Sequence, residues 1–237
     1  MVYVNKNITV QRLEELYKQQ NDFTNFDKTF LFEKFIDIIL SFNKKINFES
    51  NYPNLKKVNS AEELVKIFQL RSEIYGNLGY QNEFPNYLPN MNFDFYDENS
   101  AIIYTEDNKE ITSTCRLIFD SSKKLPIEEK LDLSDIRIKF PKLSEISRLM
   151  VKKESKGLSL DFKYLMAGMY HLKTQNGLDA STSVFLKDHF KLYEKLGGFS
   201  IERSLDSYGH LDKPFVISSW NPVNVSRFFK KAFLKIS

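Results

Sequence analysis

Cysteine, histidine and glycine are scarce in this chain of 237 residues. Its one cysteine, Cys115, excludes an internal disulfide framework and favours a reducing compartment. The three histidines do not lie at metal-ligand spacing from one another or from Cys115, so we predict no bound metal. The eight glycines contrast with 21 phenylalanines and 12 tyrosines. This composition suits an aromatic-rich core or an apolar tunnel, although a general bias toward Phe, Tyr, Lys, Asn and Ile also explains it.

The chain also lacks an excess of either charge and any long apolar run. Its formal net charge is +3 with 27% charged residues, which gives no reason to expect nucleic-acid binding. No stretch reaches the roughly 18 apolar residues that a membrane span requires. The first residues carry no apolar run typical of a secretory signal. Together with the single cysteine, these absences predict a cytoplasmic protein.

Two regions of unequal size are predicted, an N-terminal helical extension over 1–55 and a principal domain over 56–237. The extension contains a dense apolar segment at 30–42 that is interrupted by three charged residues. We interpret this segment as a helix packed on the principal domain. A membrane-surface helix is the alternative, and the small number of charges of mixed sign disfavours it.

The principal domain combines helical and strand patterns. Ser60 and Glu63 form a capping-box pattern that begins a helix. The apolar stripe of this helix runs from Leu64 to Leu78, and Arg71 occupies a position within it. Strands are expected at 101–105, 111–118, 143–151, 181–185, 199–204 and 214–219, and further helices at 159–175 and 186–196. This order predicts an α/β fold with a mixed, mostly antiparallel sheet and helices on both faces.

Charged residues within three apolar segments form the most informative pattern. They are Arg71 with Tyr75, Asp94 with Asp97 and then Arg116, and Glu145 with Arg148. Charge in apolar surroundings is costly unless it is paired or used, so a buried arginine requires carboxylate partners. We predict one buried acid–base pocket, with a purely structural ion cluster as the alternative.

These residues, in this order, resemble the acyl-homoserine lactone synthases and the long-chain N-acyl amino acid synthases of the GNAT acyltransferase superfamily. The matching motifs are Arg71-x-x-x-Tyr75, Asp94-x-x-Asp97, Cys115-Arg116-Leu117, Glu145-Ile146-Ser147-Arg148-Leu149-Met150-Val151 and Leu192-Tyr193-Glu194-Lys195-Leu196-Gly197-Gly198-Phe199. Each motif alone is weak, but their joint order is specific. The resemblance implies a three-layer αβα sandwich whose sheet is splayed at its centre.

The resemblance also implies a reaction, the attack of an amine on the carbonyl of an acyl thioester. A base must remove a proton from the amine, and Glu145 is the candidate, because burial in an apolar strand raises the pKa of a carboxylate. A structural salt bridge to an arginine is the alternative for Glu145. Arg148 would lie on the opposite side of a regular strand, so it reaches the same pocket only across a β-bulge, or else braces a neighbouring strand. We predict Glu145 and Arg148 as the catalytic pair, with Arg148 supporting the base or binding the acceptor carboxylate.

The remaining predicted site residues bind the two substrates. The resemblance implies an acceptor site lined by Arg71, Tyr75, Asp94, Asp97 and Arg116, and oxyanion donors among the backbone N–H groups near Met150, Val151 and Lys152. Tyr193 lies where many GNAT domains place the acid for the leaving thiolate, although a core position is the alternative. Lys152, Lys153 and Lys156 lie in a stretch with one glycine, which suits a pyrophosphate poorly. Their charge favours an acidic acyl-carrier protein as donor, with a solvated basic loop as the alternative.

The acceptor is predicted from a missing aromatic residue. Synthases that use S-adenosylmethionine carry a tryptophan about ten residues after the helix arginine, where this chain has Tyr80 and Gln81. We therefore predict an N-acyltransferase that moves a fatty acyl group from acyl-carrier protein, or from acyl-coenzyme A, to the amine of an amino acid. No permanently bound cofactor is expected. The alternatives are an acyl-homoserine lactone synthase that uses S-adenosylmethionine and a non-catalytic GNAT-fold protein that binds or senses acyl groups.

Overall fold

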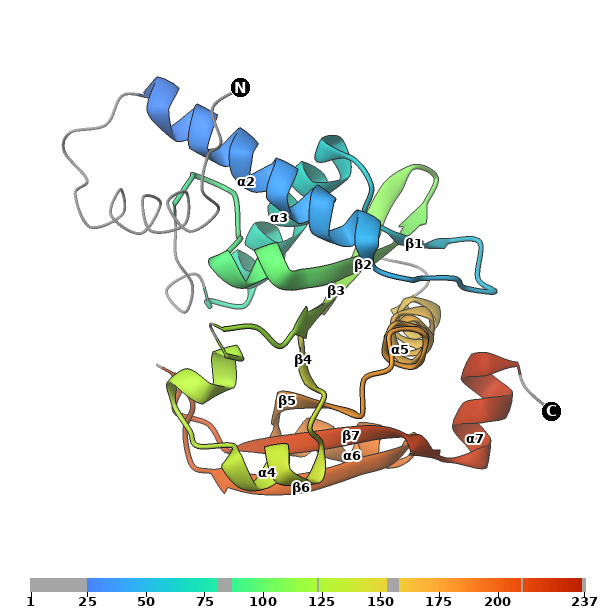
Figure 1. Cartoon of the computed structure of the whole chain (residues 1–237). Helices are drawn as coiled ribbons and strands as arrows, with labels where there is room; N and C mark the ends of the chain where they lie inside the picture. The colour runs from blue at the N-terminus through green and yellow to red at the C-terminus, as the bar shows by residue number, and fades with distance from the viewer. Residues whose placement is uncertain (1–24, 81–86, 123, 153–157, 210, 236–237) are drawn as a thin grey trace.

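A seven-stranded sheet organises the chain, and helices cover both of its faces (Figure 1). The computed structural model describes residues 25–80, 87–122, 124–152, 158–209 and 211–235. The strands are β1 Leu55–Lys57, β2 Ser100–Asp107, β3 Glu110–Phe119, β4 Leu143–Val151, β5 Ala180–Leu186, β6 Gly197–Leu205 and β7 Phe215–Val225. The α-helices are α2 Asn25–Lys45, α3 Ala61–Asn77, α4 Ser134–Lys139, α5 Leu158–Gln175, α6 Phe190–Glu194 and α7 Arg227–Phe229. The shorter helical segments are η2 Phe95–Asn99, η3 Pro126–Glu129, η4 Lys187–His189 and the π-helix η5 Lys230–Leu234.

The sheet divides between β4 and β5. The strand order is β1-β2-β3-β4-β5-β7-β6, and every neighbouring pair is antiparallel except β4 with β5. These two parallel strands pair only from Leu143 to Glu145 on β4, and then diverge. Figure 1 shows the two parts, β1 to β4 above and β5, β7 and β6 below. The predicted mixed, splayed sheet is thereby confirmed, and Glu145 lies at the point of divergence.

Alternation along the central strands places apolar side chains on both faces. On one face, Cys115 and Leu117 of β3 belong to a cluster that also contains Leu165 and Met169 of α5. Cys115 is fully buried there, and burial raises the pKa of its thiol to about 12. Cys115 is therefore a core residue, as the sequence predicts. On the other face, α2 and α3 pack over β2 through a second apolar cluster, which completes the αβα layers.

Helix α3 begins as the sequence predicts. The Ser60 side chain accepts a hydrogen bond from the backbone N–H of Glu63, and the Glu63 carboxylate accepts one from the backbone of Ser60, so the capping box is complete. Arg71 is fully buried, in agreement with its place in the apolar stripe. Leu78, which the stripe was expected to include, is 56% exposed because the helix ends at Asn77.

Helix α2 belongs to the core of the described structure. Its Phe35 and Ile39 are buried in the same cluster as α3. The buried Asn43 side chain donates to the backbone oxygens of Ile39 and Ser100 and accepts from the backbone N–H of Ile102. These bonds connect α2 to β2, as expected for a helix packed on the principal domain. Residues 1–24 of the predicted extension lie outside the described residues, and the division at 55 stays a prediction. Across the described parts of the chain, every helix is too short or too polar to span a bilayer.

The helix expected at 186–196 is shorter than predicted. Strand β5 continues to Leu186 and is followed by the turn η4, so α6 begins only at Phe190. The helix ends before Gly197 and Gly198, which have φ values of +75° and +78°. A side chain at Gly198 would collide with the backbone oxygen of Asn221. Glycine is therefore required where the chain turns from α6 into β6.

A lysine is buried beside the tryptophan of this core. Lys173 on α5 is fully buried, and its Nζ donates to the backbone oxygen of Trp220 and lies 4.4 Å from the centre of the Trp220 ring. Burial lowers the pKa of Lys173 well below its ordinary value, because the ammonium form loses its hydration.

We expect Lys173→Met to raise the free energy of unfolding by about 1–3 kcal/mol at neutral pH, because methionine fills similar volume without a buried ionisable group. The folded state holds the Lys173 proton less tightly than the unfolded chain does. The wild type should therefore gain stability as the pH rises toward 10.5, the ordinary lysine value. The variant should lack this gain. Urea unfolding at pH 7 and pH 9.5 measures both effects, and identical pH dependence in the two proteins would contradict the assignment.

Candidate functional site

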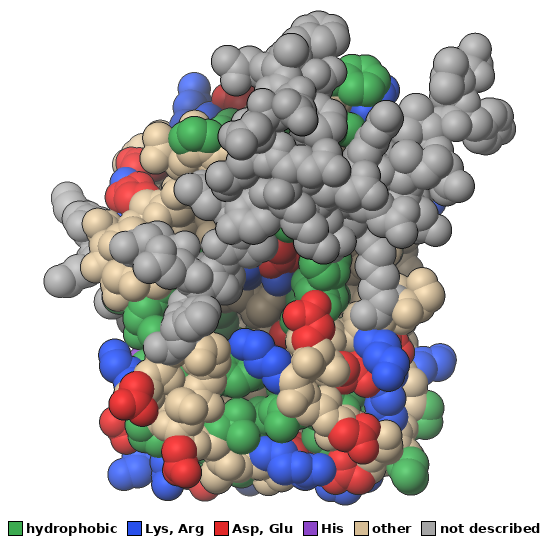
Figure 2. Space-filling view, turned by 90° about the vertical axis from the view of Figure 1, so that its left-hand side faces the viewer, with side chains coloured by type: hydrophobic (Ala, Val, Ile, Leu, Met, Phe, Trp, Pro, Cys, Tyr) green, Lys and Arg blue, Asp and Glu red, His purple; other side chains and the backbone are tan. Residues whose placement is uncertain are grey.

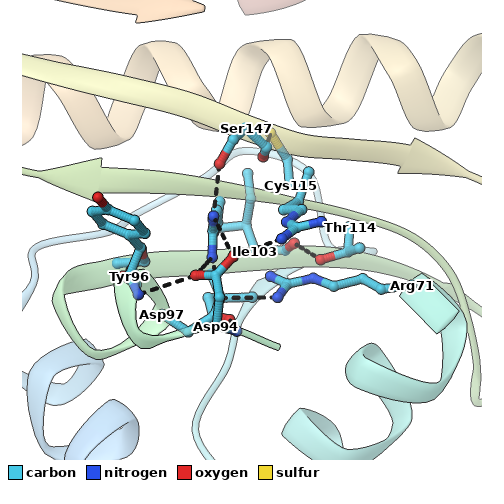
Figure 3. Close-up of polar contacts among 12 residues, drawn as sticks. Arg71, Asp94, Tyr96, Asp97, Ile103, Thr114, Cys115 and Ser147 are labelled. Carbon is cyan, nitrogen blue, oxygen red and sulfur yellow. Dashed lines mark hydrogen bonds and ion pairs between the residues drawn. The ribbon is translucent and has the colours of Figure 1, made fainter. Parts of the chain in front are cut away.

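The predicted polar residues meet on the face of β3 and β4 that α3 and η2 cover (Figure 3). Figure 2 shows a hollow in the middle of the molecule, with acidic and basic side chains visible inside it. Six charged side chains of the site are between 0% and 7% exposed: Arg71, Asp94, Asp97, Arg116, Glu145 and Arg148. The predicted buried acid–base pocket is therefore present.

The helix η2 holds the two aspartates in place. Asp94 is its N-cap residue, and its Oδ1 accepts a hydrogen bond of 3.0 Å from the backbone N–H of Tyr96. Oδ2 of Asp97 accepts one of 3.0 Å from the backbone N–H of Asp94. The Asp-x-x-Asp spacing is thus a capping box, which orients both carboxylates before any arginine is considered.

Three arginines surround the two carboxylates. Arg116 forms a two-point ion pair with Asp94, from Nη1 to Oδ1 at 2.6 Å and from Nη2 to Oδ2 at 3.0 Å. Nη2 of Arg148 donates to the same Oδ2 at 2.6 Å. Nη1 of Arg71 and Nη1 of Arg116 both lie near Oδ1 of Asp97, at 2.9 Å and 3.0 Å. Three arginines against two aspartates give the cluster a formal excess of one positive charge.

The arginines decide the protonation of Asp94. Burial acts to raise the pKa of this carboxyl, but the guanidinium groups of Arg116 and Arg148 outweigh burial and hold it well below its usual range. Burial alone acts to lower the pKa of Arg116, and the two aspartates more than reverse this effect. Asp94 is therefore a permanent anion at neutral pH, and it orients arginines instead of exchanging protons.

Arg148 enters this cluster through a β-bulge. The register between β3 and β4 shifts by one residue, so that Arg148 and Leu149 together stand opposite Cys115. Arg148 has φ +54°, a left-handed conformation that a non-glycine residue rarely adopts. The bulge turns its guanidinium to the face that carries Asp94. Of the two geometries that the sequence left open, the structure shows the bulge.

Glu145 has surroundings unlike those of the aspartates. Its Oε2 accepts a hydrogen bond of 3.0 Å from the backbone N–H of Ile127, and it forms no ion pair within the described part of the chain. Burial raises the pKa of Glu145 to about 7, against opposing effects from this hydrogen bond and from the charge of Arg116. A carboxyl of this kind can both take up and release a proton near neutral pH. The salt-bridge alternative for Glu145 is not what the structure shows.

The remaining predicted residues are placed in different ways. The Tyr75 ring lies 5.2 Å from Cζ of Arg148, at the edge of the cluster. Met150 pairs with β3 close to the bulge, and Val151 follows it. The backbone N–H of Lys152 donates to the oxygen of Thr112 at 2.8 Å. Its expected use as an oxyanion donor is therefore wrong, because that hydrogen bond continues the β3–β4 ladder.

The expected carrier-binding lysines are only partly described. Nζ of Lys152 lies 2.8 Å from a carboxylate oxygen of Glu110 and 3.9 Å from one of Glu73, so its charge is balanced within the chain. Lys153 and Lys156 lie outside the described residues, as does Gln81 of the acceptor argument. Their part in donor binding stays a prediction.

Tyr193 is buried in an aromatic group. Its ring stacks on Phe185 of β5 at 4.0 Å, and burial raises the pKa of its hydroxyl. The hydroxyl keeps its proton at neutral pH, which suits either alternative, a core residue or a proton donor.

Two contributors to the site are absent from the prediction. Oγ of Ser147 accepts a hydrogen bond of 2.8 Å from Nε of Arg116 and so positions that guanidinium. Its place two residues after Glu145, on the same face of a strand, was a usable signal. The backbone of Ile127 is the other contributor, and it arrives through a turn that no local pattern connects with β4.

A family model for the N-acyl amino acid synthase FeeM matches residues 66–221, which is more than half of the chain. The chain belongs to the FeeM family of N-acyl amino acid synthases. This family match identifies it as an acyltransferase. No curated protein matches the chain by sequence. Within the described residues, the chain contains no group of His, Cys, Asp and Glu side chains that could hold a metal ion.

Solved structures support the fold of this FeeM-family protein. FeeM, an N-acyl amino acid synthase from uncultured soil microbes, aligns with a TM-score of 0.60 and 15% identity, over 71% of this chain and 89% of that one. BjaI is a coenzyme A-dependent acyl-homoserine lactone synthase that was solved with S-adenosylmethionine and isopentyl-coenzyme A. It aligns with a TM-score of 0.58 and 15% identity, over 74% of this chain and 82% of BjaI. The acyl-homoserine lactone synthase LasI aligns with a TM-score of 0.57 and 14% identity, over 76% of this chain and 93% of LasI. At these identities the likeness shows the fold, and it confirms the GNAT-like architecture.

Proposed function

We propose that this acyltransferase moves a fatty acyl group from the thioester of an acyl-carrier protein to the α-amine of an amino acid. The observation that carries the proposal is the pairing of Glu145, with a pKa raised to about 7, with an adjacent cluster of formal charge +1. An amino acid presents an amine that must lose protons and a carboxylate that needs a cation. Both needs are met within one buried site.

Arg71 supports a carboxylate-bearing acceptor. Its Nη1 contacts Asp97, but its Nε and Nη2 are buried and have no hydrogen-bond partner among the described residues. Buried guanidinium donors without partners are costly, and a bound carboxylate would satisfy them. Arg71 and the supporting Arg148 are the groups we assign to this carboxylate, and Tyr75 and Arg116 to the wall of the acceptor site.

The reaction needs one base and a set of oxyanion donors. The ammonium form of the amine first releases one proton to water. Glu145 takes a second proton from the nitrogen while the nitrogen attacks the thioester carbonyl and forms the new C–N bond. We assign the oxyanion to the backbone N–H of Val151, which points to the side where β4 has left β5. The N–H groups of Met150 and Lys152 point to β3 instead, because alternate residues of a strand face the same neighbour. Collapse of the intermediate breaks the C–S bond, and the proton on Glu145 returns to the leaving thiolate, directly or through Tyr193. The products are an N-acyl amino acid and the free thiol.

The donor is proposed on the sequence of the segment after β4. Its Lys152, Lys153 and Lys156 and its single glycine favour the one phosphate of a carrier-protein arm over a pyrophosphate. Lys152 is balanced by Glu110, so Lys153 and Lys156 are the stronger part of this proposal. A cytoplasmic location follows from a donor of this kind.

S-adenosylmethionine is the second candidate acceptor, because BjaI, an acyl-homoserine lactone synthase of similar fold, is solved with it. The tryptophan expected for such an acceptor about ten residues after Arg71 is missing from this chain. The only tryptophan, Trp220, is fully buried in the core and does not replace it. An amino acid is therefore the favoured acceptor. A protein that binds acyl groups without turnover is disfavoured by the isolated, titratable Glu145.

The purified protein should be incubated with a long-chain acyl-carrier protein and either pooled amino acids or S-adenosylmethionine, and the products read by mass spectrometry. We expect an N-acyl amino acid from the first pool. An acyl lactone together with methylthioadenosine from the second pool would favour the alternative acceptor. The same incubation with acyl-coenzyme A in place of the carrier tests the donor. Binding of the carrier without any product would contradict an enzyme.

A further inference from the structure

The last helical segment of the described chain carries a concentrated basic charge. Residues 226–235 contain Arg227, Lys230, Lys231 and Lys235 and no acidic residue. All four are exposed, and none of them forms an ion pair with a described residue. Phe228 lies among them and is 56% exposed. We call these five residues the basic C-terminal face.

The opposite side of the same segment fixes this face to the core. Phe229 is fully buried and lies 5.9 Å from the ring of Trp220, while Phe233 stacks on Phe229 at 4.9 Å. The Ser226 side chain caps the segment by accepting from the backbone N–H of Phe229. Figure 1 shows α7 at the side of the molecule, next to α5. The exposed cations and Phe228 are thus presented on an ordered support.

The same face lies at the end of a row of aromatic rings. The row begins in the divided sheet with Phe185, which stacks on Tyr193, and continues to Phe162 of α5 at 5.8 Å. Phe233 follows at 6.5 Å, and Phe228 contacts Phe233 at 5.8 Å. A continuous row of aromatic side chains therefore runs from Phe185 on β5, the strand that diverges from β4, to Phe228, the exposed ring of the basic C-terminal face.

We propose that the basic C-terminal face binds the surface of an anionic lipid bilayer. Exposed cations that lack carboxylate partners, in one short helical segment with an exposed aromatic ring, are the pattern of peripheral membrane contact. In such contacts the charges meet lipid phosphates and the ring enters the interface. An acidic protein could pair with the four cations, but it would not explain why Phe228 is exposed at the end of the aromatic row. A lipid interface accounts for both the cations and the exposed ring. The proposal depends on charge and exposure, and it goes beyond the proposed function, which places no part of the protein on a membrane.

The test is co-sedimentation of the full chain with large vesicles of phosphatidylcholine alone or with about 30% phosphatidylglycerol, a composition chosen for its negative charge. We expect binding only to the anionic vesicles, and we expect about 0.5 M salt to abolish it. Lys230→Glu with Lys231→Glu should weaken binding by at least about tenfold, and Phe228→Ser by about threefold or more. Lys124→Glu with Lys142→Glu is the matched control, since both lysines are exposed and the change of charge is the same.

The outcomes separate this proposal from the proposed function. Acyl transfer in the absence of vesicles should be equal in the wild type and in all three variants, whether or not binding is found. Equal vesicle binding by the Lys230/Lys231 variant and the control variant would overturn the proposal. A failure of every form to bind vesicles, with a raised KM for acyl-carrier protein in the Lys230/Lys231 variant alone, would overturn it too and assign the face to the carrier instead.

Discussion

Replacing Glu145 with glutamine is expected to reduce kcat/KM for acyl transfer by about a hundredfold to ten-thousandfold, the usual contribution of a general base. Glutamine has nearly the same shape and can still accept the hydrogen bond from Ile127, but it cannot take a proton from the amine. Ionisation of the acceptor amine raises kcat/KM with pH in both proteins, so the ratio of wild-type to variant kcat/KM isolates Glu145. This ratio should rise with pH through about 7 and then level, because only the ionised carboxylate acts as a base. Rates measured from about pH 5.5 to 8.5 test both points.

Stability measurements distinguish loss of the base from loss of the fold. Because the pKa of Glu145 is raised in the folded state, the folded protein binds this proton more tightly than the unfolded chain does. Its ionisation therefore lowers stability as the pH rises from about 4.5 to about 7. Glutamine removes this effect, so at pH 8 the variant should be more stable than the wild type by about 3 kcal/mol. Glu33→Gln, at an exposed position on α2, should change neither rate nor stability. A variant at position 145 with near-normal rates would remove Glu145 from the mechanism.

Asp94→Asn is expected to lower the free energy of unfolding by about 3–5 kcal/mol, the usual cost of removing one partner from a buried ion pair. Asp94 balances both Arg116 and Arg148, and asparagine leaves these two buried guanidinium groups with one carboxylate fewer. Urea unfolding at pH 7 measures the change. Asp107→Asn, on an exposed carboxylate at the end of β2, is the matched control and should change the value by less than about 0.5 kcal/mol.

Two further measurements connect this effect to the charge of Asp94. The pKa of Asp94 is held below its usual range in the folded protein. The ion pairs of Asp94 therefore stabilise the fold fully above the pKa of an unfolded aspartate, and this stabilisation is lost as the pH falls toward the lower pKa of the folded state. The difference in the free energy of unfolding between wild type and Asp94→Asn should therefore become smaller at acid pH. Adding Arg148→Met to Asp94→Asn should restore part of the lost stability, because it removes one of the uncompensated guanidinium groups. An equal loss in the single and double variants would contradict the ion-pair account.

Much of the candidate site could be predicted from the sequence because its parts are local patterns. The Ser60 capping box, the arginine in the stripe of α3 and the strand at 143–151 depend on residues within one or two turns or along one strand. The Asp-x-x-Asp spacing marked both carboxylates, although its role as the cap of η2 was not recognised. Prediction failed where strand and helix tendencies compete. The helix expected from residue 186 begins only at Phe190, because β5 extends to Leu186 and the turn η4 follows it.

By itself, the sequence determined which residues are charged within apolar segments, the order of the elements and the resemblance to an acyltransferase family. Only the tertiary structure decided which charges meet. The bulge at Arg148 and the hydrogen bond from Ile127 to Glu145 depend on strands and turns distant in sequence, and so does the contrast between Glu145 and Asp94. Two buried carboxylates acquire opposite pKa shifts, because one is surrounded by guanidinium groups and the other is mainly desolvated. That difference arises only when the sheet and η2 have assembled.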